Sequence, residues 1–198
     1  MMSLAMRKIT PADILPDADY AAQRAELRAG SIAEKRNRRM EVGPYATFYF
    51  ENYQSMWLQV QEMLRIEKGG AEQVAGELEA YNPLIPQGSE LIATVMIEIE
   101  DAARRERELR RLGHIEDSAF LEIGGERIKG TPTDYEDRTT ADGKTSSVHW
   151  LRFVFTTAQI AAFKSGSGRV VLGFTHENYG HMAVLPEAVR AALAKDFA

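Results

Sequence analysis

The sequence contains no cysteine. This absence excludes a disulfide scaffold, a cysteine-ligated iron–sulfur cluster, a thiolate zinc site and a cysteine nucleophile. No apolar run approaches the roughly 18–20 residues that a transmembrane helix needs, so we expect no membrane partner. The segment from Met1 to Met6 is too short for a secretory signal peptide, and either Met1 or Met6 is the translation start. We therefore expect a cytoplasmic protein.

An excess of basic charge is also missing. Lys and Arg number 24 against 29 Asp and Glu, which gives a net charge of −5. Proteins that bind phosphate backbones usually carry a basic excess, so the balance argues against nucleic acid as a partner. One run differs, because four of its five residues are cations: Lys35, Arg36, Arg38 and Arg39. It indicates either a patch that binds anions or nucleic acid, or the solvated C-terminal end of a helix.

Several catalytic signatures are absent as well. The chain has no Gly-x-Ser-x-Gly elbow, no Walker loop, no Gly-x-Gly-x-x-Gly turn and no His-Glu-x-x-His pair. The Ser-Gly-Ser-Gly run at 165–168 follows a predicted helix rather than opening one, so we interpret it as a connector.

What is present is an ordinary globular composition. The 198 residues are 44% hydrophobic, enough for a real core in one domain. We expect residues 1–198 to form a single domain, with 1–8 as a disordered leader. Period-two alternation predicts strands over 45–50, 91–99, 120–128 (a hairpin), 148–155, 170–176 and 181–185. Helical spacing and caps predict helices over 11–13, 17–39, 61–67, 71–81, 101–112, 156–163 and from 186 onward.

The order of these elements predicts an α+β fold, with a mostly antiparallel sheet and helices packed on it. Residues 56–60 fit both a strand and a helix, so they form either a short hairpin return or the start of the helix that follows. The aromatic strand at 45–50 is a candidate sheet edge. Pairing of this edge across a two-fold axis would make a homodimer.

The histidines are the best candidate metal ligands in a chain without cysteine. His149 and His176 each share a strand face with apolar residues. If their strands are neighbours, the two imidazoles converge, and Glu67, Glu98 or Glu177 completes a site for iron or zinc. The alternative is that each imidazole packs at a sheet end and bonds a backbone carbonyl group.

The other two histidines carry less information. His114 follows Gly113 and is interpreted as an exposed turn residue. His181 lies five residues after His176 across a glycine, a spacing that suits a loop rather than a helix face.

A second group of polar residues, Glu62, Arg65 and Glu67, lies on one predicted helix. Glu67 falls on the apolar stripe, where an unpaired carboxylate is costly. The group is therefore either a general base or metal ligand, or a structural ion-pair cluster that positions the helix.

Several blocks of the chain together resemble a known family. They are Met6–Pro16, Val42-Gly43-Pro44, Phe50-Glu51-Asn52, Gln59–Arg65 with Glu67, Glu79–Pro86, Val148–Phe153 and His176–Tyr179. The family is the bacterial domain-of-unknown-function family numbered 3501, and the resemblance runs from Met6 to Phe197. Where the family usually reads Asp-His-Pro, this chain has Thr175-His176-Glu177.

The resemblance implies no assigned activity. Family members resemble gene neighbours of rubrerythrin-like and iron–sulfur oxidoreductase proteins. This association implies an accessory or binding protein in redox or oxidative-stress metabolism, with a redox protein as its partner.

Overall fold

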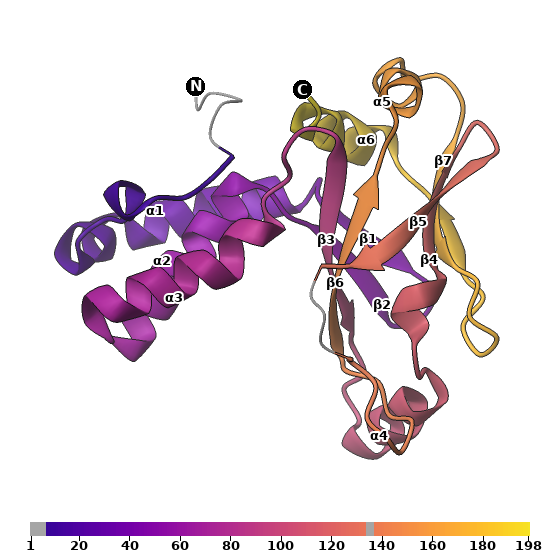
Figure 1. Cartoon of the computed structure of the whole chain (residues 1–198), viewed down its shortest axis with the longest axis horizontal. Helices are drawn as coiled ribbons and strands as arrows, with labels where there is room; N and C mark the ends of the chain where they lie inside the picture. The colour runs from indigo at the N-terminus through magenta and orange to yellow at the C-terminus, as the bar shows by residue number, and fades with distance from the viewer. Residues whose placement is uncertain (1–6, 134–136) are drawn as a thin grey trace.

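Among the residues that the structure describes, eight antiparallel strands form one sheet in the order β1-β2-β3-β6-β5-β4-β7-β8 (Figure 1). The computed structural model describes residues 7–133 and 137–198. The strands are β1 (Arg39–Val42), β2 (Ala46–Phe50), β3 (Glu90–Ile97), β4 (Ala119–Ile123), β5 (Glu126–Pro132), β6 (Val148–Val154), β7 (Val170–Phe174) and β8 (Met182–Val184). With the helices described next, this arrangement confirms the predicted α+β fold.

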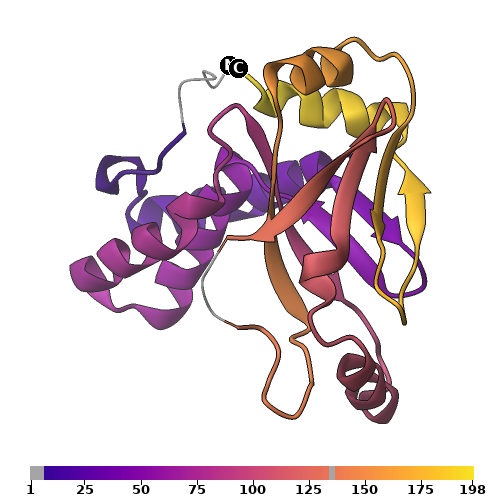
Figure 2. The same ribbon diagram turned by 45° about the vertical axis from the view of Figure 1, so that its right-hand side comes forward.

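The sheet curls so that its two edge strands approach each other (Figure 2). Inside the curl, the Phe48 ring on β2 lies 5.2 Å from the Phe174 ring on β7 and 6.4 Å from the Phe153 ring on β6. Tyr179 joins the edges, because its hydroxyl donates to the Val42 carbonyl at 2.8 Å and accepts from the Ala46 amide at 3.0 Å. The result is an open barrel with a closed apolar interior.

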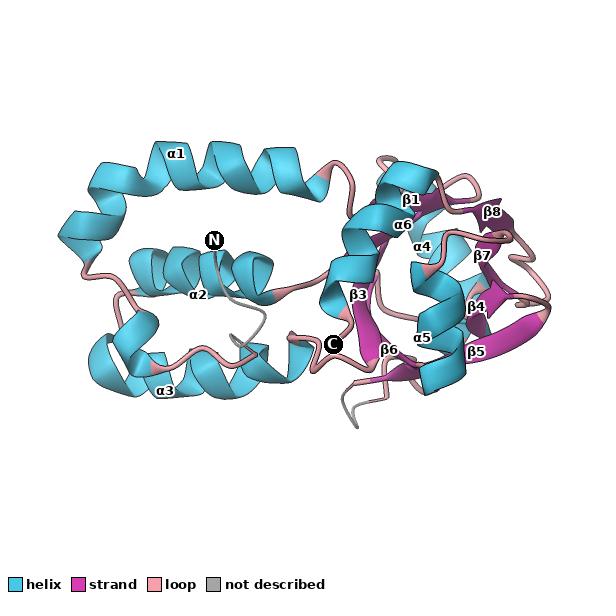
Figure 3. Cartoon of the chain, turned by 90° about the horizontal axis from the view of Figure 1, so that it is seen from above, coloured by secondary structure: helices cyan, strands magenta, loops and turns pink. Residues whose placement is uncertain are grey.

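The longer helices form a separate layer on one side of the barrel (Figures 1 and 3). These helices are α1 (Asp17–Lys35), α2 (Tyr53–Glu67) and α3 (Gly70–Tyr81). Three shorter helices lie at the barrel ends, α4 (Ala102–Arg111) at one and α5 (Thr157–Lys164) with α6 (Glu187–Leu193) at the other. Single 3-10 turns span Pro11–Asp13, Asn82–Leu84, Ile115–Ser118 and Ala194–Asp196. Across the described ranges, no helix combines the length and apolarity needed to cross a membrane.

A second hydrophobic core joins the helical layer to the barrel. Ile92 on the outer face of β3 is fully buried against Trp57, Met56 and Leu84, and Trp150 of β6 packs against the same cluster. This contact explains why residues 91–97 are apolar on both faces, since one face lines the barrel and the other meets helices.

The N-terminal half of the sheet differs from the sequence prediction in two ways. The first helix ends at Lys35 rather than at Arg39, because Met40 and Val42 alternate as part of β1. The aromatic strand β2 is not an edge, since it pairs with β1 on one side and β3 on the other. Pairing through this strand therefore does not explain a dimer, and a homodimer stays a prediction.

The two segments with open predictions are partly settled. Residues 56–60 are helical, because the Asn52 side chain accepts from the Ser55 amide at 2.9 Å and starts α2 at Tyr53. Of the predicted disordered leader, residues 1–6 lie outside the described residues, and so does the choice between Met1 and Met6. Arg7 is placed against the fold, since its carbonyl accepts from Gln87 Nε2 at 2.8 Å.

Candidate functional site

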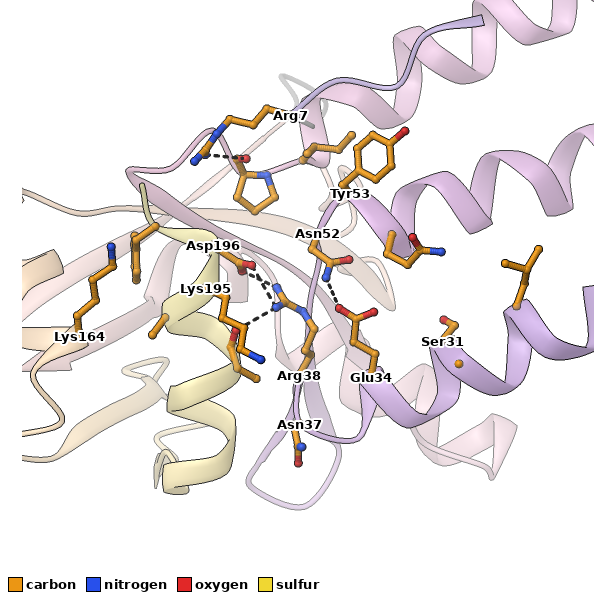
Figure 4. Close-up of a pocket in the computed structure, with 18 of the residues that line it drawn as sticks. Arg7, Ser31, Glu34, Asn37, Arg38, Asn52, Tyr53, Lys164, Lys195 and Asp196 are labelled. Carbon is orange, nitrogen blue, oxygen red and sulfur yellow. Dashed lines mark hydrogen bonds and ion pairs between the residues drawn. The ribbon is translucent and has the colours of Figure 1, made fainter. Parts of the chain in front are cut away.

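A cleft of about 1150 Å³ lies where the helical layer meets the barrel (Figure 4). One wall is the inner side of α1, the start of α2 supplies a second, and the segments around 85–86, 164 and 192–197 supply the rest. The cleft thus depends on both parts of the molecule. Its volume is slightly above the roughly 300–1,000 Å³ of most small-molecule sites.

The floor of the cleft is a buried ion pair between Arg38 and Asp196. The Arg38 guanidinium donates to both carboxylate oxygens of Asp196, at 3.1 and 2.5 Å, and to the Phe50 and Glu51 carbonyl groups at 3.0 Å. Burial raises the pKa of Asp196, and the adjacent Arg38 charge acts in the opposite direction. Arg38 therefore joins the end of α1 to the start of α2 and to the C-terminal turn.

Three further cations, Arg7, Lys164 and Lys195, line one end of the cleft. Arg7 Nη1 donates to the Pro86 carbonyl at 3.4 Å, and Lys164 Nζ donates to the Ala198 carbonyl at 2.8 Å. Within the ranges 7–133 and 137–198, none of the three forms an ion pair with an Asp or Glu side chain. We call this group the basic end of the cleft.

Gly88 is the residue that lets Arg7 reach this position. Its φ of +107° is open to glycine, and a Cβ at this position would overlap the Arg7 guanidinium. The Gly88 carbonyl also accepts from the Ala198 amide at 3.0 Å, which fixes the C-terminal segment beside Arg7.

The α1 wall of the cleft carries the opposite charge. Glu34 accepts from Asn52 Nδ2 at 2.6 Å, and Glu26 lines the same wall. The cleft therefore has carboxylates along α1 and cations on the barrel side, with apolar residues such as Leu27, Ile85 and Phe197 also in its lining (Figure 4).

The predicted basic run is divided between two environments. Arg38 is buried in the floor of the cleft, whereas Lys35 and Arg36 are exposed at the end of α1. Arg39 pairs with Glu41 at 2.7 Å on β1. The four cations do not form one patch, because the chain changes from helix to strand within the run.

The predicted metal ligands are not brought together. Strands β6 and β7 are separated by β5 and β4, so His149 and His176 are not on neighbouring strands. His149 Nε2 lies 2.9 Å from the Ser146 carbonyl, and His176 Nε2 lies 3.1 Å from the Gly113 carbonyl. These contacts match the alternative interpretation, in which each imidazole bonds a backbone carbonyl group.

The predicted carboxylate ligands lie elsewhere on the surface. Glu98 is exposed and accepts from the Tyr49 hydroxyl at 3.2 Å. Glu67 is exposed at the end of α2 and accepts from Gln73 Nε2 at 3.1 Å. Glu177 is exposed beside His176. The set proposed from the sequence therefore does not assemble.

Glu62 joins α2 to α1 rather than to its predicted neighbours. Its carboxylate accepts from the Tyr20 hydroxyl at 2.5 Å, from Arg24 twice at 2.7 Å and from Arg28 at 3.1 Å. The Arg24 hydrogen bonds hold the pKa of Glu62 at about 2, although burial acts in the opposite direction. Arg65 pairs separately with Asp17 at 3.2 Å. Glu62, Arg65 and Glu67 thus make three separate contacts, and the Glu62 contacts are structural in kind.

A histidine–carboxylate group that the sequence did not reveal lies at the α4 end of the barrel. His114, Glu116 and Asp137 each offer one ligand atom, and these atoms lie within 4.8 Å of one another. His114 and Glu116 are two residues apart, a weak signal that was available. Asp137 belongs to a different loop, and no local pattern connects it to them.

Comparison with known proteins identifies relatives but no activity. A crystal structure of a novel protein of unknown function from Burkholderia pseudomallei K96243 is similar to this chain, with a TM-score of 0.89 and 34% sequence identity. The similarity covers 96% of this chain and all of the other. No curated protein matches the chain. The model of the family described as "Protein of unknown function (DUF3501)" matches residues 8–197, and the chain therefore belongs to this family.

Proposed function

We propose that this protein is a binding protein whose cleft holds a small polar molecule carrying a carboxylate or phosphate group. The observation that supports this proposal is the basic end of the cleft, where three cations have no acidic side chain as a partner in the described ranges. The chain has 29 Asp and Glu residues against 24 Lys and Arg residues, so there are enough carboxylates for every cation to form an ion pair. Cations held beside a cleft without them favour an anionic ligand.

The floor of the cleft has a different part in this proposal. The Arg38–Asp196 pair neutralises itself and is already hydrogen-bonded on most sides. It therefore shapes the cleft rather than supplying free charge. The ligand's anion is bound by Arg7, Lys164 and Lys195, and its hydroxyl or amino groups face Glu26 and Glu34 on α1.

The proposal keeps the expectation of a binding protein. It assigns anion binding to Arg7, Lys164 and Lys195 in place of the basic run at 35–39. A redox protein as partner, a cytoplasmic location and a homodimer stay predictions. Binding of nucleic acid by the run at 35–39 gains no support from the split of that run between the cleft floor and the surface.

The test is binding of succinate, inorganic phosphate and glucose 6-phosphate to the whole chain at low ionic strength. We expect at least one probe to raise the unfolding temperature in a concentration-dependent way, since a ligand of the native state stabilises it by mass action. Lys195→Ala and Arg7→Ala should each lower the affinity for that probe about fivefold or more, because each variant loses one charge-assisted hydrogen bond.

The matched control is Lys129→Ala, which removes an exposed lysine on β5. It should leave the affinity unchanged. Equal affinity in Lys195→Ala, Arg7→Ala and the control would contradict the assignment of the basic end, and no response to any of the three probes would contradict the proposed ligand class.

A further inference from the structure

A second site lies at the end of the barrel opposite to α5 and α6, where α4 leads into β4 (Figure 1). The chain leaves α4 through Gly113 and turns at His114, whose φ of 60° is in the left-handed region. This conformation costs a non-glycine residue about 1 kcal/mol or more. The turn leads into the 3-10 helix Ile115–Ser118, which carries Glu116.

Thr139 holds a second loop against this turn. Its hydroxyl oxygen accepts from the His114 amide at 2.9 Å, and its own amide donates to Asp137 Oδ1 at 2.9 Å. The loop is further tied to α4, because the Thr145 amide donates to the Leu109 carbonyl at 3.0 Å. One threonine therefore fixes the backbone of one candidate ligand and the side chain of another.

The two loops together present one imidazole and two carboxylates. Their ligand atoms lie within 4.8 Å of one another. Atoms that share one metal ion at about 2.1 Å are separated by about 3–4.2 Å. Because the His114 and Asp137 side chains are exposed, small rotations are enough to close the group on an ion.

Glu116 is the independent observation that points to a ligand. Its side chain is only 7% exposed, and its Oε2 atom accepts no hydrogen bond within the described ranges. The His149 Nδ1 atom lies 3.4 Å from this oxygen. A buried carboxylate oxygen that accepts no well-formed hydrogen bond is costly, and a bound cation lowers that cost.

We propose that His114, Glu116 and Asp137 bind a divalent transition-metal ion. The imidazole favours Zn²⁺, Mn²⁺ or Fe²⁺ over Mg²⁺ and Ca²⁺, which prefer all-oxygen sites. Three protein ligands leave coordination positions for water or a small molecule. His149 is a positioning residue, because it contacts Glu116 rather than the exposed side of the group.

This inference is separate from the proposed function, since the cleft and the metal site share no residue. It also differs from the ligand set expected from the sequence. His149 lies beside the site through its contact with Glu116, and His176 bonds the Gly113 carbonyl next to His114, but neither is a proposed ligand, and Glu67 and Glu98 form their contacts elsewhere.

The test is calorimetric titration of the untagged, chelator-treated chain with ZnCl₂, MnCl₂ and MgCl₂ in turn. We expect one equivalent of Zn²⁺ or Mn²⁺ to bind, and Mg²⁺ to bind at least about tenfold more weakly. Glu116→Gln, which keeps the shape and removes the charge, should weaken binding by about tenfold or more. His114→Asn should do the same, because asparagine tolerates the left-handed backbone and lacks the imidazole.

The matched control is His181→Ala, which removes an exposed imidazole that contacts Tyr179 instead of the group. It should bind metal as the unchanged chain does. Absence of Zn²⁺ and Mn²⁺ binding, or equal affinity in His114→Asn and the control, would overturn the proposal. His114→Asn decides the result if circular dichroism shows that Glu116→Gln is unfolded.

Discussion

The barrel and helix α1 are held in place by different interactions. The barrel encloses a large apolar core in which Phe48, Phe153 and Phe174 are almost fully buried. Helix α1 is 19 residues long and buries only Tyr20 and Ser31. Its attachment to α2 depends instead on hydrogen bonds and ion pairs, most of which meet at Glu62.

This difference has consequences for the cleft between them. Burial of apolar area depends weakly on pH and salt, whereas an ion-paired contact depends on both. The α1 wall of the cleft is the part attached by charge, and the basic end is attached to the barrel. Conditions that loosen α1 should therefore open the cleft without unfolding the barrel.

The largest effect is expected from Phe48→Ala in the barrel core. Phe48 is fully buried and contacts the rings of Phe50, Phe153 and Phe174. Its truncation should lower the free energy of unfolding by about 3–5 kcal/mol. Urea unfolding followed by circular dichroism measures this loss, with Met182→Ala as a control because Met182 is 63% exposed. A loss below about 1 kcal/mol would show that the barrel interior is not the dominant core.

The sequence predicts the parts of this fold that depend on neighbouring residues. Alternation located β3 and β6, and the Thr156–Gln159 capping box located the start of α5, because these signals act over a few residues. The prediction that the 45–50 strand forms a sheet edge was wrong, since alternation says nothing about which strands are neighbours. The short strand β1 was missed because four residues after a basic run resemble a helix end.

The candidate sites show the same limit more sharply. The basic run drew attention to Arg38, yet its partner Asp196 lies 158 residues away, so its structural part was not predictable. His114 precedes β4 and Asp137 follows β5, so the pairing of these two strands places the two loops at the same end of the sheet. For Glu62, the sequence indicated an ion pair but not that the partners lie on α1.

A smaller effect is expected from Glu62→Gln in the helical layer. The substitution removes the charge that Arg24, Arg28 and the Tyr20 hydroxyl share, so it should cost about 1–3 kcal/mol at pH 7. Urea unfolding monitored at 222 nm measures the loss. The matched control is Glu67→Gln, which changes an exposed carboxylate on the same helix by the same chemistry and should cost less than about 0.5 kcal/mol.

The pH dependence of the stability loss in Glu62→Gln tests whether the loss comes from the carboxylate charge. The pKa of Glu62 is about 2 in the folded protein against 4.5 for an unperturbed glutamate, so the unfolded chain binds the proton more tightly. The stabilisation is therefore complete above about pH 4.5 and is lost as the pH falls towards 2. The gap between the unchanged chain and Glu62→Gln should narrow over this range. A constant gap would mean that the glutamine disturbs packing rather than charge.

The smallest effect is expected from the second contact between α1 and α2, the Arg65–Asp17 pair. Its side chains are 37% and 69% exposed, so water and salt screen the attraction. A double-mutant cycle with Arg65→Ala and Asp17→Ala should give a coupling of about 0.2–1 kcal/mol in dilute buffer and none detectable near 0.5 M salt. If instead the coupling equalled the loss in Glu62→Gln, the attachment of α1 would be spread evenly along the helix. A coupling within the expected range would place the polar attachment of α1 at Glu62, through Tyr20, Arg24 and Arg28, rather than at the Arg65–Asp17 pair.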